Sequence, residues 1–384
     1  MTFAEIVVVG LHLPWDGVWQ RPNHVLSRIA RDVPVLVVEE SRPADRDETA
    51  VRSEGNVTVI SSLRAAPHDA LDAPTIERVR DVVRNRTAVI WLYTPMMLGL
   101  SAAFGDAPIV YDKMDELAQF AGADPRLRPR ETELLAHAAC VFTGGRSLHA
   151  SVRERAQRAA CYPSGVDIEH FARARSLSPH ADLAPYAGRP VYGYVGVVDE
   201  RLDLALIAHV AAHRPDAVVV LVGPVAKIDE RSLPRAENIV YLGARPYAEL
   251  PSILAGFDVA LMPFALNEHT EMISPTKTLE YLAAGKPVVS TRVPDVVADH
   301  ADVVAIADDA AQFTALLPSS GPPSASWTAR VDAKLRGATW DRIVDAMRAD
   351  LKQAGIALGA DQRPARSTSI ERTASAARSS AARR

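Results

Sequence analysis

Short apolar runs rich in β-branched residues alternate with longer amphipathic stretches along most of this chain. Near-continuous apolarity over roughly four to six residues is typical of strands buried on both faces, and helical stretches between such strands predict right-handed βαβ crossovers. The pattern therefore predicts an α/β fold with parallel sheets. The runs are Ile6–Val9, Val35–Val38, Val57–Ile60, Ala88–Tyr93, Ile109–Tyr111, Ala139–Phe142, Val191–Val195, Val218–Val222, Ile239–Leu242, Val259–Met262, Val288–Ser290 and Val303–Ile306.

The length of 384 residues exceeds that of one ordinary core and predicts two domains. Their boundary is expected between Phe171 and Pro190, where the sequence is rich in Ala, Arg, Pro and Ser and has no periodic pattern. We expect two facing Rossmann-like domains that enclose a cleft, because ligands bind at the carboxyl ends of the strands in such sheets. The predicted domains span residues 1–175 and 186–335.

The end of the chain is expected to differ from both domains. Residues 318–326 are predicted to form a loop, and residues 338–357 an amphipathic helix that packs back on the N-terminal domain, with Ile343, Val344, Met347 and Leu351 on one stripe. Residues 360–384 are a basic Arg/Ser/Ala tail, which cannot bury enough apolar surface to order itself. The tail is interpreted as disordered; whether it also contacts a partner or a membrane stays open.

Composition excludes several classes of function. A net charge of −4 and a pI near 6.3 give no general attraction to nucleic acid or anionic lipid. Cys140 and Cys161 are interpreted as small buried hydrophobes. The N-terminus lacks the features of a signal peptide, and no run reaches the roughly 20 apolar residues of a membrane span. A cytoplasmic location is expected, with peripheral contact at the inner face of the membrane left open and the oligomeric state undetermined.

The most informative window runs from Met262 to Thr291. A buried strand ends, a polar loop follows, and a helix then begins, with Ser274 predicted as its N-cap and Pro275 at its first position. Gly285 is expected to end this helix.

Lys277 is an unusual residue for the first turn of a helix, where the macrodipole is positive. A cation there is understandable if an anion also binds, and the Ser274 and Thr276 hydroxyls, free N–H groups and Lys277 together suit a diphosphate. Glu280, one turn on, suits the vicinal diol of a ribose. The alternative is a Lys277–Glu280 pair on a solvated helix face.

This window resembles the retaining glycosyltransferases of the family 4 type, which have the glycosyltransferase-B fold. The resemblance rests on Ser274-Pro275-x-Lys277-x-x-Glu280-Tyr281-Leu282-Ala283-Ala284-Gly285-Lys286-Pro287 and the following Val288-Val289-Ser290-Thr291. It implies that 274–277 bind the donor pyrophosphate and that Glu280 holds the ribose. Many members carry a sugar-contacting glutamate where this chain has Met272, so Glu271 is the candidate for that contact and the donor sugar is left open.

Three further segments agree with the resemblance. Gly193-Tyr-Val-Gly196, followed by Arg201, is similar to the family's second phosphate contact, the alternative for Arg201 being a surface helix position. The segment from Tyr241 to Tyr247, with Arg245, resembles the loop that recognises the base, or is an ordinary turn. Residues 258–264 resemble the strand and loop that lead to the donor pocket.

In the N-terminal half, the loop after the first strand is predicted to form the acceptor side of the cleft. Trp15 and Trp19 suit a sugar face, Gly17 permits close backbone approach, and Gln20, Arg21 and His24 offer donors. A lone histidine near a helix start is more often structural than catalytic, so the loop as a unit is better evidence than His24. The Gln20-Arg21-Pro22-x-His24 run resembles bacterial cell-surface polysaccharide transferases of the teichuronic-acid type.

Two other strand-end segments are candidates. Asp112 and Asp115 follow the run at Ile109–Tyr111, where relatives carry a sugar-contacting histidine. They are predicted either to replace that contact or to cap the next helix. Residues 144–147 form a glycine-containing strand-end loop, interpreted as a cleft loop or a structural turn.

The predicted function is transfer of a sugar from a nucleoside-diphosphate sugar to a glycan, lipid-linked or small-molecule acceptor. Arg201 and Lys277 would stabilise the charge that develops on the departing diphosphate, an arrangement that replaces a divalent metal. No metal or cofactor other than the co-substrate is predicted, and retention follows from the resemblance alone. A sugar-nucleotide 2-epimerase and a non-catalytic nucleotide-sugar-binding protein are the alternatives. A nicotinamide-dependent oxidoreductase is disfavoured, because Gly10 is not followed by the Gly-x-Gly-x-x-Gly pattern.

Overall fold

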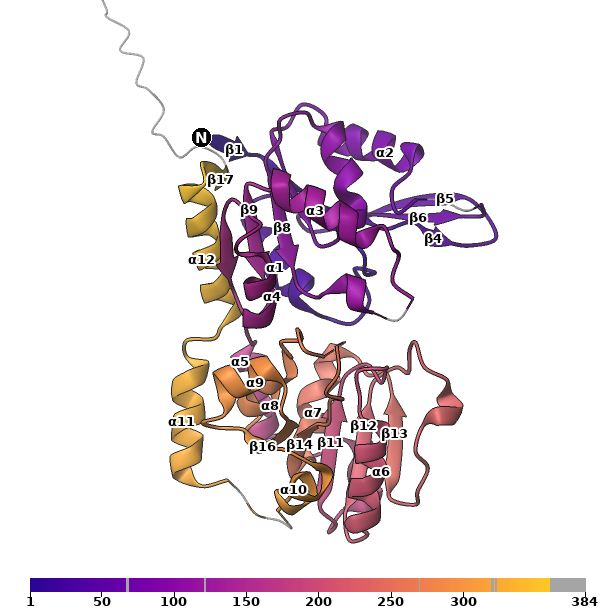
Figure 1. Cartoon of the computed structure of the whole chain (residues 1–384), viewed down its shortest axis with the longest axis vertical. Helices are drawn as coiled ribbons and strands as arrows, with labels where there is room; N and C mark the ends of the chain where they lie inside the picture. The colour runs from indigo at the N-terminus through magenta and orange to yellow at the C-terminus, as the bar shows by residue number, and fades with distance from the viewer. Residues whose placement is uncertain (67–68, 121, 269, 319–320, 322, 360–384) are drawn as a thin grey trace, which may run out of the picture.

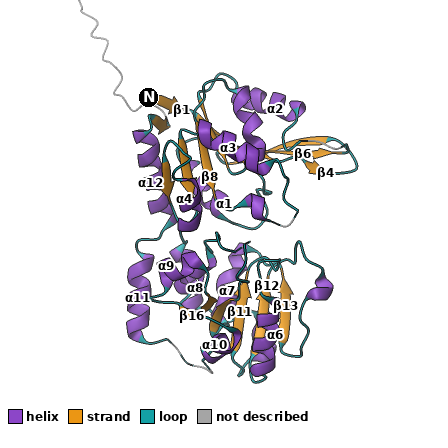
Figure 2. Cartoon of the chain, in the orientation of Figure 1, coloured by secondary structure: helices purple, strands orange, loops and turns teal. Residues whose placement is uncertain are grey.

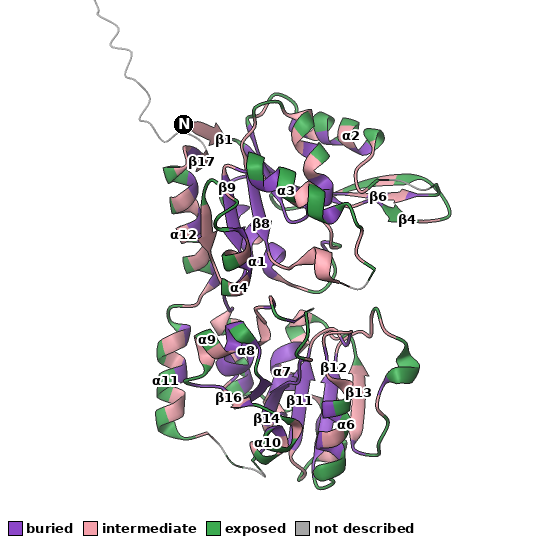
Figure 3. Ribbon diagram, viewed as in Figure 1, coloured by how far each residue is buried: buried purple, intermediate pink, exposed green. Residues whose placement is uncertain are grey.

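In the computed structural model, which describes residues 1–66, 69–120, 122–268, 270–318, 321 and 323–359, the chain forms two Rossmann-like α/β domains that face each other (Figure 1). The predicted tail over 360–384 lies outside the described residues. Strands of both domains are largely buried, whereas the outer faces of the helices are exposed (Figure 3). The described chain contains no helix long and apolar enough to cross a membrane.

The N-terminal sheet has the strand order β10-β9-β8-β7-β2-β3-β6-β4, and all of these strands are parallel. Its strands are β2 (Ile6–Leu11), β3 (Val35–Glu39), β4 (Arg42–Pro43), β6 (Val57–Arg64), β7 (Ala88–Leu92), β8 (Ile109–Lys113), β9 (Cys140–Thr143) and β10 (Ala159–Cys161). The strand β5 (Glu48–Glu54) adds to β6 in antiparallel fashion. Val7 and Val9 belong to the core on one face of this sheet, and Ile6 and Val8 to the core on the other. Burial on both faces explains the continuous apolar runs.

The C-terminal sheet has the order β13-β12-β11-β14-β15-β16 and is parallel throughout. Its strands are β11 (Val191–Val195), β12 (Val218–Val222), β13 (Ile239–Gly243), β14 (Val259–Met262), β15 (Val288–Thr291) and β16 (Ala305–Ala307). The chain order reverses between β11 and β14. Such a switch point places loops from both halves of the sheet around one crevice at the carboxyl edge.

Helices connect most of the parallel strands (Figure 2). They are α1 (Arg21–Ile29), α2 (Ala73–Val83), α3 (Leu127–His137), α4 (Arg146–Val152), α5 (Ile168–Ala172), α6 (Leu204–His213), α7 (Leu250–Ala255), α8 (Lys277–Ala283), α9 (Pro294–His300), α10 (Ala310–Ala315), α11 (Ala325–Leu335) and α12 (Trp340–Gln353). Short 3-10 turns are η1 (Pro95–Ala103), η2 (Leu117–Gln119), η3 (Arg173–Arg175), η4 (Ala181–Tyr186), η5 (Glu230–Ser232) and η6 (Tyr247–Glu249).

The end of the described chain returns to the N-terminal domain. Helix α12 lies beside that domain in Figure 1, and its buried residues Trp340, Val344, Met347 and Leu351 share a core with Val7. The short strand β17 (Ile356–Leu358) then pairs with β1 (Thr2–Ala4). The apolar stripe of α12 accounts for this return, because a helix buries such a stripe against a neighbouring core.

Every apolar run predicted as a strand contains a strand in the structure, although β16 begins only at Ala305, and Val303 and Val304 of the predicted run lie in the turn before it. The β5–β6 hairpin and the short strands β1, β4, β10 and β17 were not predicted, because they are mostly exposed or too short to carry a clear pattern. The expected loop over 318–326 ends early. Helix α11 begins at Ala325, where the Ser324 hydroxyl accepts a hydrogen bond from the Trp327 N–H.

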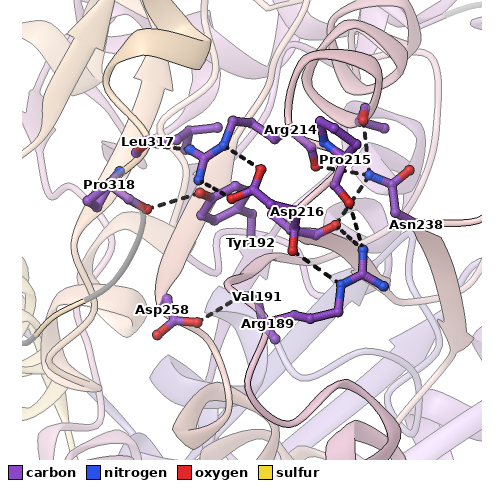
Figure 4. Close-up of polar contacts among 12 residues, drawn as sticks. Arg189, Val191, Tyr192, Arg214, Pro215, Asp216, Asn238, Asp258, Leu317 and Pro318 are labelled. Atoms are coloured by element: carbon purple, nitrogen blue, oxygen red, sulfur yellow. Dashed lines mark hydrogen bonds and ion pairs between the residues drawn. The ribbon is translucent and has the colours of Figure 1, made fainter.

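A polar cluster closes the amino ends of β11 and β12, opposite the cleft (Figure 4). The Arg214 guanidinium pairs with Asp216 at 3.0 Å and lies over the Tyr192 ring at 5.0 Å. Arg189 donates to the carbonyls of Pro215 and Asp216, and the Tyr192 hydroxyl donates to the Pro318 carbonyl at 3.0 Å. These side chains satisfy backbone carbonyls at the sheet edge, so this end of the domain is structural.

The loop 144–147, predicted as either a cleft loop or a turn, joins the two domains. Asp295 of α9, 3% exposed, accepts hydrogen bonds from the backbone N–H groups of Arg146 and Ser147 at 2.8 and 3.1 Å and from the Ser147 hydroxyl at 2.6 Å. The Arg146 guanidinium also pairs with Asp299 at 2.5 Å. A Cβ at Gly145 would lie 2.6 Å from the Cβ of Ser274, so the close approach of the domains requires glycine here.

Candidate functional site

Two neighbouring cavities lie between the domains, at the carboxyl ends of β2, β11, β12 and β14. The smaller cavity, of about 140 Å³, is lined by predicted residues from both domains: Gln20, Asp115, Gly196, Arg201, residues 274–277 and Glu280. The larger cavity, of about 520 Å³, is lined by residues that include Gly17, Trp19, Gly196, Arg245, Tyr247 and Lys277. Gly196, Trp19 and Lys277 border both cavities, which therefore form one continuous cleft.

Helix α8 begins later than the sequence predicted. Its N-cap is Thr276, which has helical φ and ψ of −53° and −31°, and Ser274 and Pro275 precede it. The Thr278 N–H donates to the Pro275 carbonyl at 3.2 Å, so a tight turn leads into the helix. The Thr276 hydroxyl donates to the Ser164 hydroxyl at 3.3 Å. Gly285, with φ of +74°, ends the helix as predicted. Because α8 is short, the positive charge at its N-terminus comes from side chains more than from the helix macrodipole.

Lys277 and Glu280 form an ion pair, with Nζ 2.9 Å from Oε2. This is the pairing that the alternative interpretation predicted, but it does not lie on a solvated face. The Glu280 side chain is 3% exposed and that of Lys277 is 19% exposed, and both border the smaller cavity. A buried carboxylate is retained in a cleft only if it is paired or serves a ligand. Lys277 reaches both cavities, so a ligand that spans them would contact its ammonium group.

Arg201 places a second cation at the smaller cavity. Its guanidinium is held by Asp199, with Nε 3.0 Å from Oδ1 and Nη2 2.6 Å from Oδ2. Its side chain is 24% exposed, so the surface-helix alternative for Arg201 is wrong. Asp115 of the N-terminal domain lines the same cavity; burial raises its pKa, and the charges of Arg201 and Lys227 oppose that rise. The cavity therefore has cations on one wall and a carboxyl group on the other.

Gly196 and Gly223 form the contact between the loops after β11 and β12. Gly223 has φ of +148°, and a Cβ on it would lie 1.8 Å from the Gly196 carbonyl oxygen. Gly223 lines the larger cavity and was not predicted, although a Gly-Pro pair after a buried strand was available as a signal.

The sequence predicts nucleoside diphosphate binding in this cleft. On that prediction, Gly223→Ala should weaken the binding by about 10-fold or more, because the Gly196 backbone must move to admit the methyl group. Fluorescence-detected titration would measure the affinity. Gly337→Ala is a matched control, since the nearest atom to a Cβ there is 3.6 Å away. Equal affinities for both variants would contradict a tight Gly196–Gly223 contact at the binding cleft.

The loop after β13 closes the larger cavity. Arg245 pairs with Asp182 of η4, so its guanidinium is fixed against the segment between the domains. Tyr247 packs face to face on His170, with ring centroids 4.1 Å apart, and its ring lies 5.9 Å from that of Trp19. A wall of aromatic rings and backbone suits a planar heterocycle. Arg245 shapes the loop, and its charge is already paired with Asp182.

The structure separates the acceptor-side candidates into two groups. Gly17, Gln20 and Asp115 line the cleft together with Trp19 and Arg21. Trp15 does not: it is buried in the N-terminal core, and its backbone N–H donates to the Glu39 carboxylate at 2.8 Å. Glu271 is exposed and lines neither cavity.

Asp112 is also absent from the cavity walls. It is 0% exposed and pairs with Arg21 at 2.9 Å, so it neither faces the cleft nor caps a helix. The two residues are 91 positions apart in sequence, which explains why the pairing could not be predicted from sequence spacing.

His24 is a structural histidine in this structure. It is 2% exposed, lies flat on the Trp340 ring at 4.7 Å, and its Nδ1 is 3.3 Å from the Trp19 Nε1, which donates to it. Burial lowers the pKa of His24 to about 3, and the charges of Arg28, Lys277 and His170 act in the same direction. His24 is therefore neutral at physiological pH and positions Trp19 at the cleft.

Stability should fall as the pH drops below about 6.5, because His24, His12 and His300 have pKa values lowered to about 3, 4 and 4, mainly by burial. Unfolded histidines bind protons from about pH 6.5 downward, whereas the folded ones do not, so protonation favours the unfolded chain. Urea unfolding at pH 7 and pH 5 should show a lower midpoint at pH 5. His24→Phe, which keeps the stacking, should reduce this difference; an unchanged difference would contradict a neutral buried His24.

A further cavity, of about 370 Å³, lies at the carboxyl ends of β2, β3 and β7 in the N-terminal domain. His12, Glu40 and Thr94 each follow one of these strands and line the cavity together with Asp124 and Arg126. The Thr94 hydroxyl donates to Glu40 at 3.0 Å, and burial raises the pKa of Glu40. Nδ1 of His12 is buried without a hydrogen-bond partner among the described residues. Sequence reasoning missed these residues, because single polar residues after strands carry no distinctive pattern.

Within the described residues, no group of three or more His, Cys, Asp or Glu side chains is arranged to hold a metal ion.

Comparison with known proteins agrees with this architecture. Residues 189–317 match the family described as glycosyl transferases group 1. A 134-residue segment is 31% identical to a Bacillus subtilis (strain 168) protein named as a teichuronic acid biosynthesis glycosyltransferase, TuaH. That match spans about a third (34%) of this chain and of the relative.

Solved structures align over nearly the whole chain at low identity. The trehalose 6-phosphate synthase of Burkholderia multivorans has a TM-score of 0.63 and 16% identity, over 92% of this chain and 99% of its own. The sucrose-phosphate synthase of Thermosynechococcus elongatus has a TM-score of 0.66 and 16% identity, over 90% and 98%. HepE of Anabaena, solved with UDP and glucose, has a TM-score of 0.66 and 15% identity, over 91% and 99%. The chain therefore has the two-domain glycosyltransferase-B fold, and its C-terminal domain matches the group 1 glycosyltransferases.

Proposed function

We propose that this protein transfers a sugar from a nucleoside-diphosphate sugar to a hydroxyl group of a saccharide or lipid-linked acceptor. The observation that carries the proposal is the convergence of Lys277, Arg201, Gly196 and Glu280 on one interdomain cleft. Two cations beside a close-approaching glycine suit a diphosphate, and a buried carboxylate next to them suits a ribose diol. The group 1 glycosyltransferase match over the same domain supports this assignment.

The donor would lie across both cavities. Its base would occupy the larger cavity, against the Arg245–Tyr247 loop and the Trp19 ring. Its ribose and diphosphate would lie where the cavities meet, at Lys277 with its partner Glu280, and at Gly196. The sugar would then enter the smaller cavity, beside Asp115 and Gln20. In this arrangement Glu280 exchanges its pairing with Lys277 for the ribose hydroxyls, and Lys277 turns to the phosphate.

The chemistry assigned to the site is electrostatic. As the bond between the anomeric carbon and the phosphate oxygen breaks, its electron pair passes to the diphosphate, and Lys277 and Arg201 stabilise the growing negative charge. The acceptor oxygen bonds to the anomeric carbon, and its proton passes to the departing phosphate. Retention of configuration belongs to the proposal on the strength of the family resemblance. Two fixed side-chain cations supply the positive charge, so turnover without added metal is part of the proposal.

The acceptor is proposed to approach from the N-terminal domain. The cavity lined by His12, Glu40 and Thr94 opens at the same strand edge as the Trp19 loop and offers both donors and acceptors of hydrogen bonds. A neutral, hydroxyl-rich acceptor fits these groups, because Arg126 is already paired with Asp69 and Asp124. The named role of the Bacillus relative in teichuronic acid biosynthesis favours a cell-envelope saccharide.

A panel of UDP-, GDP-, ADP- and dTDP-sugars tests this function. Thermal shift should identify the preferred donor, because a ligand that binds only the folded state raises the unfolding temperature. Release of the nucleoside diphosphate should then accelerate when cell-envelope saccharides or lipid-linked sugars are added, with or without a chelator. Interconversion of the donor sugar without transfer would indicate a 2-epimerase, and binding without any turnover would indicate a nucleotide-sugar-binding protein.

A further inference from the structure

An aromatic side chain of the N-terminal domain lies against two cations of the C-terminal domain. Phe120 directly follows η2, in the segment that connects β8 to α3. The Lys227 ammonium lies 3.8 Å from the centroid of its ring, and the Arg201 guanidinium carbon lies 5.7 Å from it. Both distances are within the range of cation–π attraction. Phe120 therefore makes an electrostatic contact across the interface between the domains.

Arg201 is fixed from two directions by this arrangement. Asp199, of its own domain, holds two of its nitrogens at 2.6 to 3.1 Å, and the Phe120 ring approaches from the other domain. A guanidinium held by one carboxylate can still pivot about that contact. A second contact, to the Phe120 ring, restricts this motion. A cation stabilises a developing anion best when it is already held in the correct position before the reaction.

Lys227 has a different role from Arg201. It lines neither of the two cleft cavities, its backbone is in the left-handed region with φ of +61°, and its ammonium lies 3.9 Å from the Glu200 carboxylate. The ring of Phe120 therefore contacts one cation that lines the cleft and one that does not.

We propose that Phe120 is a positioning residue for sugar transfer: its ring, anchored by Lys227, holds Arg201 toward the donor diphosphate when the two domains are in contact. The inference rests on the proposed function, because it assigns to Arg201 the stabilisation of the departing diphosphate. It also links the chemistry to the interface, since the ring and the cation belong to different domains. Separation of the domains would release Arg201 to Asp199 alone.

The test is a double-mutant cycle between Phe120 and Arg201. Phe120→Leu keeps an apolar side chain but removes the ring face, and should lower kcat for nucleoside diphosphate release by about 10-fold, the size expected for a partly desolvated cation–π contact. Phe120→Tyr should restore most of the lost rate. In an Arg201→Ala background, Phe120→Leu should have almost no further effect, because its target is gone. Phe104→Leu, at the end of η1 in the same domain, is the matched control and should match wild type.

The outcomes separate the inference from the proposed function. If the wild type turns over, three results would overturn the role of Phe120 and leave the proposed function intact. They are an unchanged kcat in Phe120→Leu, no recovery of kcat in Phe120→Tyr, or the same loss of kcat from Phe120→Leu when Arg201 is already alanine. Wild-type protein that neither binds nucleoside diphosphates nor turns over would overturn the proposed function and the role of Phe120 with it. Thermal unfolding of each variant shows whether a lost rate reflects lost folding; a large drop in the unfolding temperature of Phe120→Leu would make Phe120 a residue of structural stability and contradict the inference.

Discussion

Lys277→Ala is expected to lower turnover by roughly 100- to 1,000-fold, the loss seen when one preorganised charge or donor is removed from a developing anion. Among the described residues, Lys277 is the one lysine or arginine that lines both cleft cavities. Glu280→Ala should instead act mainly on donor binding, by about 10-fold or more, because the buried carboxylate is assigned to the ribose. Steady-state kinetics with the preferred donor measure both effects.

Neither variant should unfold the protein, although Lys277→Ala should lower its stability, because it leaves the 3% exposed Glu280 carboxylate without a counter-charge. Each removes one partner of a pair at the cleft wall, whereas the core of the C-terminal domain lies beneath it, at residues such as Tyr281 and Leu282. Lys352→Ala and Glu237→Ala change exposed residues of the same types and should behave as wild type. Normal kcat in Lys277→Ala would rule out its assignment to the departing diphosphate.

Asp112→Ala is expected to destabilise the protein by about 3–5 kcal/mol, because it leaves the Arg21 guanidinium buried and without its counter-charge. Arg21 is 2% exposed, and its guanidinium also donates a hydrogen bond to the Tyr162 carbonyl at 2.7 Å. Burial raises the pKa of Asp112 even against the Arg21 charge, which shows how costly this carboxylate is to bury. Denaturant unfolding measures the change.

Loss of the whole Arg21–Asp112 pair should destabilise the protein less than loss of Asp112 alone. Replacing both residues by apolar ones, as in Arg21→Met with Asp112→Leu, should recover much of the stability lost in Asp112→Ala. Asp106→Ala, three residues before the same strand, is an exposed control. If Asp112→Ala keeps full stability and loses activity, Asp112 belongs to the sugar site after all.

The architecture was predictable because the strands of both sheets are buried on two faces. Runs such as Val218–Val222 are apolar throughout, and this pattern needs no tertiary information to be read. The β5–β6 hairpin was not predictable in the same way. Residues 48–54 are mostly exposed and mixed in character, so their pairing with β6 depends on the fold around them.

The cleft residues of the C-terminal domain were predictable from topology, because Gly196 and Arg245 closely follow the carboxyl ends of parallel strands and Lys277 begins the helix after the next such loop, residues 263–276. The N-terminal candidates were less so. Trp15 and Trp19 share one loop, yet Trp15 enters the core and Trp19 borders the cleft. Which aromatic residue turns inward depends on packing partners such as Glu39 and Asn23, which are supplied by other elements.

Calorimetric titration of nucleoside diphosphates into wild type, Lys277→Ala and Glu280→Ala tests the central assignment most directly, because it needs neither the donor sugar nor the acceptor. The Glu237→Ala variant serves as the control. The account predicts that wild type and Glu237→Ala bind one diphosphate with equal affinity and that both site variants bind it at least about 10-fold more weakly. Unchanged affinity in both Lys277→Ala and Glu280→Ala would contradict the placement of the donor diphosphate and ribose in this cleft.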